Sequence, residues 1–517
     1  MAKVLFINPR VREEDVPRHV PYGIALLASI IMEKGHKVQI YDENAWRSST
    51  SVRKQIFQAD DWDVIALGGI TTAYGSIKEI VGMARNLCPN ATIVLGGGVL
   101  TSLPTEIMFW LYQVDIGVIG EAFVTFPEIL DMIDKGGKEF SEIPGTISTD
   151  EKGILKMGPI RELIEDLDTL PYPAWDLFPL EEVYFPNSQV LFSEEGMLAN
   201  RRLDVNASYG CSLICRYCYH LGLSGDMRYE FSDEKENPKA VFDEPGNYTR
   251  QIRYHSPEYI VEMVKYMYDK YKIDFIGFLD ENLMTMDKFS GRTWMKGICE
   301  GFHEKKLALK YKKNGAWSGI HWSGTSHATL QTPEILKIMR GAGCSHLVYG
   351  YESFSPHVMK TIGKGATPKT NIRSFFNTLE ADIRPIPNQI FGFPNEDFES
   401  IYQNMDAWKK LGIIVKPFFA TPYPGSEWFK VYRKQIEEQY NGDLEAFILA
   451  LGDATRVTAV ISHNFNSVEL LGLRVMMING DLEGIQRYEK IWRDNHRIKN
   501  GKPSTIFADP IKAGFTA

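Results

Sequence analysis

Short apolar runs alternate with amphipathic segments along about the first 165 residues of the chain. Residues 23–34 place four apolar side chains on one helical face, and Gly35 ends this predicted helix. Strands that alternate with helices favour a parallel sheet covered by helices. We therefore expect an α/β domain over residues 1–165 with a five-stranded sheet. The predicted strands are residues 3–8, 36–41, 63–67, 92–95 and 115–119.

Glycines follow three of these predicted strands directly. In an open parallel sheet, ligands bind beyond the carboxyl ends of the strands, where such turns lie. Glycine has no side chain, so a ligand can approach the backbone closely there. We therefore expect this edge of the sheet to bind a ligand. The glycines are Gly68, Gly69, Gly96, Gly97, Gly98 and Gly120.

A second strand–helix series begins near residue 204, after residues 166–200, which are rich in Pro, Asp and aromatic side chains. We expect this Pro-rich segment to be a linker that lies over the surface. Six parallel strands separated by helices predict a partial barrel over residues 201–426, with its chemistry at the carboxyl ends of the strands. The predicted strands are 204–207, 275–279, 321–325, 346–351, 385–392 and 415–421, and the clearest helix is 257–271.

Two segments carry no motif. Residues 224–251 are polar and lack periodicity, so we expect a lid or a substrate-contacting insertion. Residues 427–517 are expected to be a mainly helical C-terminal region with a loose tail.

Composition narrows the class of protein. A hydrophobic fraction of 44% and a charged fraction of 24% in 517 residues are typical of a globular chain with more than one domain. The formal net charge of −9 argues against nucleic-acid binding, which needs a basic surface. The N-terminus runs directly into a strand-like segment, so we expect no signal peptide, no membrane span and a cytoplasmic location.

Three of the six cysteines, Cys211, Cys215 and Cys218, crowd into eight residues in a C-x3-C-x2-C pattern after a predicted strand. Iron–sulfur clusters are held by cysteine thiolates, and three thiolates leave one iron of a [4Fe–4S] cluster open. The alternative is a zinc site with His220 as a fourth ligand. The remaining cysteines are scattered, and six in so long a chain do not form a disulfide framework.

This cysteine loop, with Tyr217 at the aromatic position, resembles the signature of the radical S-adenosylmethionine (SAM) superfamily. The resemblance implies that three cysteines bind a [4Fe–4S] cluster. It further implies that the amino and carboxylate groups of SAM chelate the fourth iron. One electron would then cleave SAM to methionine and a 5′-deoxyadenosyl radical.

Three later segments resemble SAM-binding motifs of the same superfamily. The segment 278–282 resembles the acidic element that holds the methionine amino group, with Asp280 or Glu281 as the contact. Glu352 stands where a glutamate contacts the cofactor in relatives. Gly392 belongs to a glycine motif beside the adenine, in which Asn395 replaces the usual glycine.

The N-terminal domain resembles the cobalamin-binding branch of this superfamily, through residues 7–9, 21–23, 96–98, 119–121 and 421–426. The implied architecture is an N-terminal Rossmann-like cobalamin-binding domain, a partial (β/α)6 radical SAM barrel and a helical C-terminal region. The resemblance suggests these cobalamin contacts: Thr71, Thr72, Tyr74, Ser76, Gly96, Gly97, Gly98, Gly120 and Glu121. The D-x-H-x-x-G motif that supplies a cobalt ligand in other cobalamin domains is missing, and His19 is a solvated loop histidine by default. A domain of this architecture that binds nothing is the alternative.

The resemblance implies a cobalamin-dependent radical methyltransferase that methylates an unactivated carbon of a small-molecule substrate. A cyclase or rearrangement enzyme with the same cofactors, or a corrinoid carrier without activity, is the alternative. The expected partner is an electron donor such as flavodoxin or ferredoxin. No catalytic residue is identified, and Tyr219, Trp317 and Trp322 are either walls of a substrate pocket or core aromatics.

Overall fold

The computed structural model describes residues 1–12, 16–150, 152–213, 215–218, 227–231, 238–242, 252–308, 310–311 and 317–498. The chain divides into two compact units. Unit 1 comprises residues 1–212, 219–324 and 341–345, and unit 2 comprises residues 213–218, 325–340 and 346–517.

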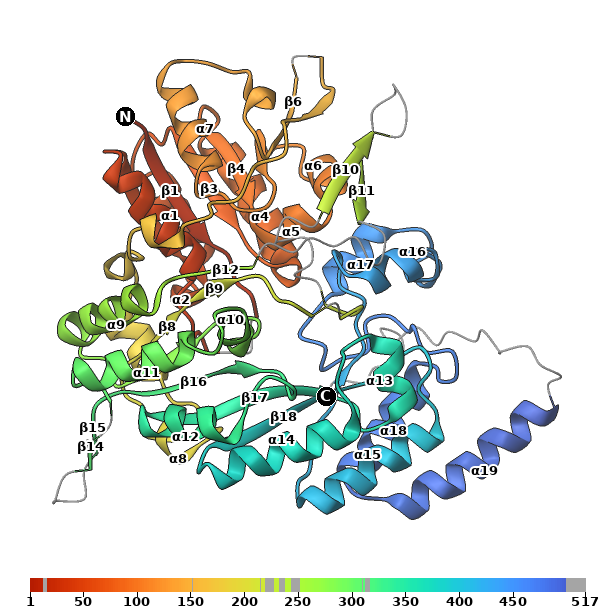
Figure 1. Ribbon diagram of the computed structural model, residues 1–517. Helices are drawn as coiled ribbons and strands as arrows, with labels where there is room; N and C mark the ends of the chain where they lie inside the picture. The colour runs from red at the N-terminus through yellow and green to blue at the C-terminus, as the bar shows by residue number, and fades with distance from the viewer. Residues whose placement is uncertain are drawn as a thin grey trace. The chain divides into compact units, whose positions relative to one another are not determined.

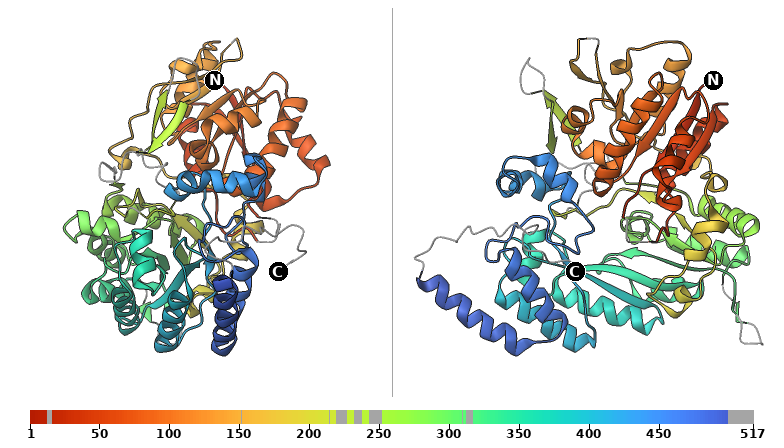
Figure 2. Two further views of the ribbon diagram at one scale, coloured as in Figure 1. Left: turned by 90° about the vertical axis from the view of Figure 1, so that its right-hand side faces the viewer. Right: turned by 180° about the vertical axis from the view of Figure 1, so that it is seen from behind.

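The N-terminal part of unit 1 is a seven-stranded sheet with the order β2-β1-β3-β4-β5-β6-β7 (Figures 1 and 2). The first five strands pair in parallel, as predicted, and one hydrophobic cluster packs helices α1 and α7 onto one face of the sheet. The strands are β1 Lys3–Asn8, β2 Lys37–Asp42, β3 Val64–Gly68, β4 Thr92–Gly96, β5 Ile116–Val118, β6 Thr146–Thr149 and β7 Leu155–Met157. The helices are α1 Tyr22–Glu33, α2 Glu43–Trp46, α3 Thr50–Phe57, α4 Tyr74–Leu87, α5 Gly97–Ser102, α6 Pro104–Trp110 and α7 Thr125–Asp134.

The prediction of five strands was incomplete, because β6 and β7 extend the sheet as an antiparallel hairpin. These strands have four and three residues and mix polar with apolar side chains. Segments this short contain no apolar run, so only pairing with β5 identifies them as strands.

The prediction of a surface linker at 166–200 was wrong. Trp175, Tyr184 and Phe185 have at most 5% of their surface exposed. Trp175 packs against Tyr22 of α1, and the hydroxyl of Tyr184 donates to Asp42 at the end of β2. Burying large aromatic surfaces stabilises the fold, so these aromatic side chains belong to the core of unit 1, whereas Leu191 and Leu198 of the same segment are exposed.

The second sheet has six strands in the order β19-β18-β17-β16-β13-β8, and it confirms the predicted partial barrel (Figure 1). The strands are β8 Arg202–Val205, β13 Phe275–Phe278, β16 His321–Ser326, β17 Cys344–Glu352, β18 Arg384–Phe391 and β19 Phe418–Phe419. Helices α9 Pro257–Tyr271, α11 Trp294–Glu304, α12 Pro333–Gly341, α14 Pro368–Glu380 and α15 Phe398–Leu411 accompany them. Shorter elements are α8 Glu194–Met197, β9 Ser208–Tyr209, β12 Arg253–Tyr254, α10 Met284–Phe289 and α13 Pro356–Ile362.

The segment 224–251 contains a β-hairpin, although its sequence shows no periodicity. Strands β10 Met227–Phe231 and β11 Pro238–Phe242 pair antiparallel, and the rest of this predicted insertion lies outside the described residues. Strands β14 Lys310–Tyr311 and β15 Trp317–Ser318 also pair antiparallel. Helices α16 Glu427–Gln439, α17 Leu444–Ala450, α18 Ser467–Ile478 and α19 Leu482–Ile498 form the predicted helical C-terminal region. Among the residues described, no helix is both long and apolar enough to cross a membrane.

Candidate cofactor site

Three side chains from separate parts of unit 2 form a buried hydrogen-bonded network. The Nζ of Lys364 donates to Glu352 Oε1 at 2.6 Å, and the hydroxyl of Tyr217 donates to the same oxygen at 2.9 Å. Lys364 Nζ also lies 3.0 Å from the Tyr217 hydroxyl. The Glu352 and Lys364 residues are only 5% and 7% exposed, so this is a buried ion pair with both charges desolvated.

The end of β17 adopts an unusual backbone to place Glu352. Its φ of 57° lies in the left-handed region, and the strand register shifts between Gly350 and Glu352. A non-glycine residue in this region costs about 1–3 kcal/mol and is retained mainly where function or packing requires it. A Cβ on Gly350 would lie 2.3 Å from Glu352 Oε1 and 2.5 Å from Lys364 Nζ, so glycine there makes room for the pair.

The network lies beside two of the three predicted cluster ligands. Burial lowers the pKa of the Lys364 ammonium, but the Glu352 carboxylate and the sulfurs of Cys215 and Cys218 outweigh it and raise the pKa above its usual value. Burial, Glu352 and the same two sulfurs raise the pKa of the Tyr217 hydroxyl. An ammonium near two thiolates favours their ionised form, which is the form that binds iron.

Backbone contacts hold this cysteine loop in unit 2. The N–H of Arg216 donates to the carbonyl of Ile362, and the Arg216 carbonyl accepts from the N–H of Trp428, both at 3.2 Å. The ring of Tyr217 lies 6.0 Å from the rings of both Phe393 and Trp428. The loop that carries Cys215 and Cys218 is therefore anchored on both sides of its central residue.

Cys211 belongs to unit 1, and it is buried. It follows the short pairing of β9 with β12 and Gly210, whose φ of 93° requires glycine. In the described ranges no three His, Cys, Asp or Glu side chains gather around a point where one metal ion would sit. A [4Fe–4S] cluster needs a wider arrangement, because each cysteine binds a different iron. The donor types and spacing therefore fit the cluster, whereas His220 of the zinc alternative lies outside the described residues.

Asp280, at the carboxyl end of β13 in unit 1, is almost fully buried. Its carboxylate accepts from the N–H of Ala207 at 3.2 Å and from the hydroxyl of Ser208. Burial raises the pKa of Asp280 to about 7, although both hydrogen bonds oppose the rise. Glu281 beside it is exposed.

The predicted adenine motif is a tight turn in unit 2 closed by a buried carboxyl group. Glu396 Oε2 accepts from the N–H of Gly392 at 3.0 Å and of Phe393 at 3.4 Å. Gly392 has a φ of 94°, and a Cβ there would also contact Leu470 at 3.3 Å. Burial raises the pKa of Glu396 to about 7.

Two of the glycine turns at the edge of the first sheet pack closely against each other. A Cβ on Gly97 would lie 2.8 Å from the backbone nitrogen of Gly69, and one on Gly68 would lie 2.9 Å from the carbonyl oxygen of Gly96. Gly98 is buried, whereas Gly120 has a φ of 75° and open space around it. The glycine pairs Gly69–Gly97 and Gly68–Gly96 therefore allow the turns after β3 and β4 to contact each other, and Gly120 stays accessible to a ligand.

The side chains predicted to contact cobalamin differ in whether they have a polar atom free for a ligand. The hydroxyl of Thr72 is buried and has no hydrogen-bond partner among the described residues, which fits a ligand that reaches this turn. Thr71 is buried, and Ser76 accepts from the N–H of Arg10 at 3.1 Å. Tyr74 is fully buried, with its ring 5.9 Å from that of Trp110, so it presents no surface to a ligand.

Glu121 and His19 are both engaged within unit 1. The Glu121 carboxylate pairs with the Arg253 guanidinium through both oxygens, with one bond of 3.0 Å. This pair joins the turn after β5 to β12, the strand that pairs with β9 just before Cys211. His19 Nδ1 lies 2.7 Å from the buried carboxylate of Asp204.

The comparisons with known proteins match two domains of this chain. Residues 12–130 match the B12 binding domain, and residues 205–407 match the radical SAM superfamily. This chain belongs to the cobalamin-binding radical SAM enzymes. The predicted cofactors are thereby confirmed as a [4Fe–4S] cluster, SAM and cobalamin, and the prediction of an enzyme is confirmed with them.

Relatives of this radical SAM enzyme include an uncharacterized methyltransferase of Pyrococcus horikoshii, PH0819. It is 28% identical over 432 residues, which cover 82% of each chain. The cytidylyl-2-hydroxyethylphosphonate methyltransferase of Streptomyces wedmorensis is 20% identical over 483 residues, which cover 82% of this chain and 80% of the relative. The solved structure of the radical SAM methyltransferase TsrM from Kitasatospora setae, with cobalamin and a [4Fe–4S] cluster bound, superimposes with a TM-score of 0.63 at 16% identity. The match covers 84% of this chain and 76% of TsrM, and it shows a shared fold.

Two residues of this radical SAM enzyme escaped the sequence analysis. Lys364 lies between two glycines in a G-K-G loop, and that loop after the Glu352 motif was the available signal. Arg253 had no local signal, because its partner Glu121 lies 132 residues away. Trp322 is a core aromatic, since it is fully buried and its indole N–H donates to the Ala342 carbonyl at 2.9 Å. Tyr219 and the side chain of Trp317 lie outside the described residues.

Proposed function

We propose that this radical SAM enzyme transfers a methyl group to an unactivated carbon of a small-molecule substrate. The observation that carries the proposal is the presence of a B12 binding domain and a radical SAM domain in one chain whose curated relatives above are both named methyltransferases. We also propose residues 1–165 as the cobalamin-binding domain, 166–200 as the segment that joins it to the barrel, 201–426 as the radical SAM barrel and 427–517 as the helical C-terminal region.

In this proposal each cofactor is held by its own set of residues. Cys211, Cys215 and Cys218 hold the cluster. When bound, the cluster supplies the electron that cleaves SAM, and cobalamin carries the methyl group. The SAM contacts are Tyr217, Asp280, Glu281, Glu352, Lys364 and Gly392. The cobalamin contacts are Thr71, Thr72, Ser76, Gly96, Gly97, Gly98 and Gly120.

The chain's own residues position and shield these groups. Lys364 pairs with the buried Glu352 carboxylate, and the Tyr217 hydroxyl donates to the same carboxylate oxygen. That orientation is set before a ligand arrives, so little ordering remains to be done on binding. Glu121 contributes through Arg253, because their pair supports the strand that leads into Cys211.

The test is an anaerobic reconstitution with iron, sulfide and hydroxocobalamin, followed by dithionite and SAM. Mass spectrometry is expected to detect both 5′-deoxyadenosine and S-adenosylhomocysteine, because a methylase uses SAM for the radical and as the methyl source. Deoxyadenosine without S-adenosylhomocysteine would contradict methyl transfer and favour a cyclase or rearrangement enzyme. The absence of both products would contradict the radical mechanism.

Cys215→Ala is expected to abolish SAM cleavage and to lower bound iron to the background level, because two thiolates cannot retain the cluster. Iron and sulfide analysis and 5′-deoxyadenosine formation measure the effect. Cys88→Ala is the matched control, since Cys88 lies outside the loop, and it is expected to keep full iron content. Equal iron content in both variants would remove Cys215 from the cluster site.

SAM affinity is expected to rise as the pH rises toward 7 and to level off above it. Burial raises the pKa of Asp280 to about 7, so below this pH the carboxyl group is protonated and accepts fewer hydrogen bonds from an amino group. The expected change is roughly tenfold per pH unit below 7. Calorimetric titrations of the reconstituted protein with SAM measure it. The difference between wild type and Asp280→Asn isolates this carboxyl group, and identical pH profiles would show that Asp280 does not contact SAM.

A further inference from the structure

Helices α13 and α14 and the loop between them form a basic surface on an acidic protein. Residues 353–379 contain four lysines and arginines, Lys360, Lys364, Lys369 and Arg373, and no aspartate or glutamate, whereas the whole chain has a net charge of −9. Lys360, Lys369 and Arg373 are exposed, and Lys364 is buried against Glu352. We call residues 353–379 the α13–α14 face.

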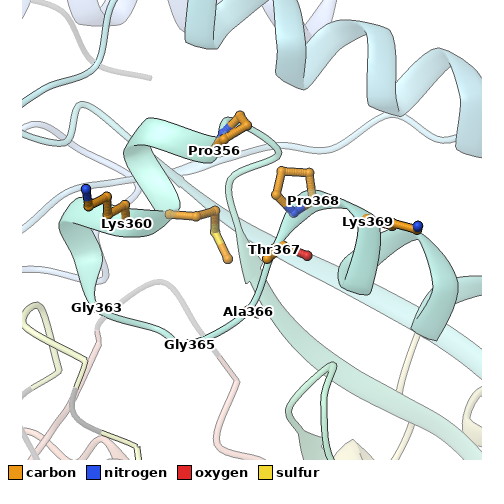
Figure 3. Close-up of a pocket in the computed structure, with 9 residues that line it drawn as sticks. Pro356, Lys360, Gly363, Gly365, Ala366, Thr367, Pro368 and Lys369 are labelled. Carbon is orange, nitrogen blue, oxygen red and sulfur yellow. The ribbon is translucent and has the colours of Figure 1, made fainter.

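A hollow lies at the centre of the α13–α14 face (Figure 3). Its volume is about 700 Å³, and its lining includes the apolar side chains of Pro356, Met359, Ala366 and Pro368. Figure 3 shows that Lys360 and Lys369 extend away from the hollow on opposite sides. An apolar hollow between cationic side chains is the pattern of a protein-binding patch with a polar rim.

The α13–α14 face adjoins the loop that carries two predicted cluster ligands. The last residue of α13, Ile362, accepts a hydrogen bond from the N–H of Arg216, which lies between Cys215 and Cys218 in sequence. Lys364 belongs to the same segment, and its side chain is buried, with Nζ 2.6 Å from Glu352 Oε1 and 3.0 Å from the hydroxyl of Tyr217, the residue before Cys218. Cys218 is only partly buried. The α13–α14 face is therefore in direct backbone contact with the loop that carries Cys215 and Cys218.

We propose that the α13–α14 face docks a small acidic electron-carrier protein, an inference that rests on the proposed function. In the step that this docking serves, the reduced carrier gives up one electron and the cluster accepts it. Complementary charge is the reason for naming an acidic partner, because opposite surface charges steer association and fix its register. Residues 353–379 contribute no carboxylate to this face, and Asp397, which lies 3.5 Å from His357, is an acidic neighbour at its edge.

The test uses the reconstituted full-length enzyme and a purified acidic flavodoxin as the probe. The test variant is Lys360→Glu/Lys369→Glu. The control is Lys409→Glu/Lys416→Glu, which changes the net charge equally at two exposed lysines near the C-terminal end of α15 and the start of β19. Helices of a β/α series end near the amino ends of the strands, opposite the edge where α14 begins, so the control lysines lie at the other edge of the sheet from Lys369.

The test variant is expected to raise the flavodoxin Kd about tenfold or more at low ionic strength, with a smaller difference in 0.5 M salt. It is expected to slow oxidation of the flavodoxin hydroquinone while leaving dithionite-driven 5′-deoxyadenosine formation unchanged, because dithionite needs no docking site. Lys360→Gln/Lys369→Gln, which removes the charges without reversing them, is expected to give an intermediate Kd. Equal Kd values for the test and control variants would overturn the proposal. Loss of dithionite-driven cleavage in wild type would instead contradict the proposed function, and the Kd comparison would still decide the docking surface.

Discussion

Lys364→Met is expected to lower the free energy of unfolding of the ligand-free protein by about 3–5 kcal/mol. The substitution leaves the Glu352 carboxylate buried with Tyr217 as its one remaining partner in the network. Removing one member of a buried ion pair leaves the other charge buried without a counter-charge. The resulting loss of folding free energy exceeds the contribution of the intact pair. Urea denaturation of the apoprotein under anaerobic conditions measures the loss.

The double variant Glu352→Gln/Lys364→Met is the control, because it removes both charges together. It is expected to recover much of the stability lost in Lys364→Met, since no buried charge is left unpaired. Its SAM affinity is expected to stay low, because Glu352 is a proposed SAM contact. A single variant as stable as wild type, or a double variant no more stable than the single one, would show that the pair is not the buried network described above.

Gly350→Ala is expected to disrupt the same network without replacing a charged residue. The new Cβ would lie 2.3 Å from Glu352 Oε1 and 2.5 Å from Lys364 Nζ. Both atoms end flexible side chains, but they are buried and bound to each other, so moving them breaks the ion pair. Overpacking at such a site costs about 1–3 kcal/mol, and SAM affinity is expected to fall with it.

Gly341→Ala is the matched substitution for this test, since nothing lies within 4 Å of a Cβ at that position. It is expected to leave both thermal unfolding and SAM binding close to wild type. Thermal unfolding of the apoprotein and calorimetry with SAM compare the two alanine variants. Equal thermal stability and SAM affinity of Gly350→Ala and Gly341→Ala would show that the close contacts at Gly350 do not affect the free energy of unfolding or SAM binding.

The predicted elements that proved reliable are those with a long and regular pattern. Helix α9, Pro257–Tyr271, begins and ends at the predicted residues, because Ser256 caps its N-terminus and its apolar face is periodic. The predicted last barrel strand, 415–421, shrinks to Phe418–Phe419, since only these residues pair with β18. An apolar run predicts burial, and whether it becomes a strand depends on a partner that the run itself does not reveal.

The sequence alone determined the class of this protein. Two local patterns carried this information: the spacing of Cys211, Cys215 and Cys218, and the alternation of strands and helices. Local patterns can be recognised directly in the sequence. Only the tertiary structure decided that Lys364 pairs with Glu352, that Arg253 binds Glu121, and that aromatic side chains of the Pro-rich segment 166–200 are core. The reason is physical: the energy of a buried charge or aromatic ring depends on neighbours distant in sequence, which only folding brings together.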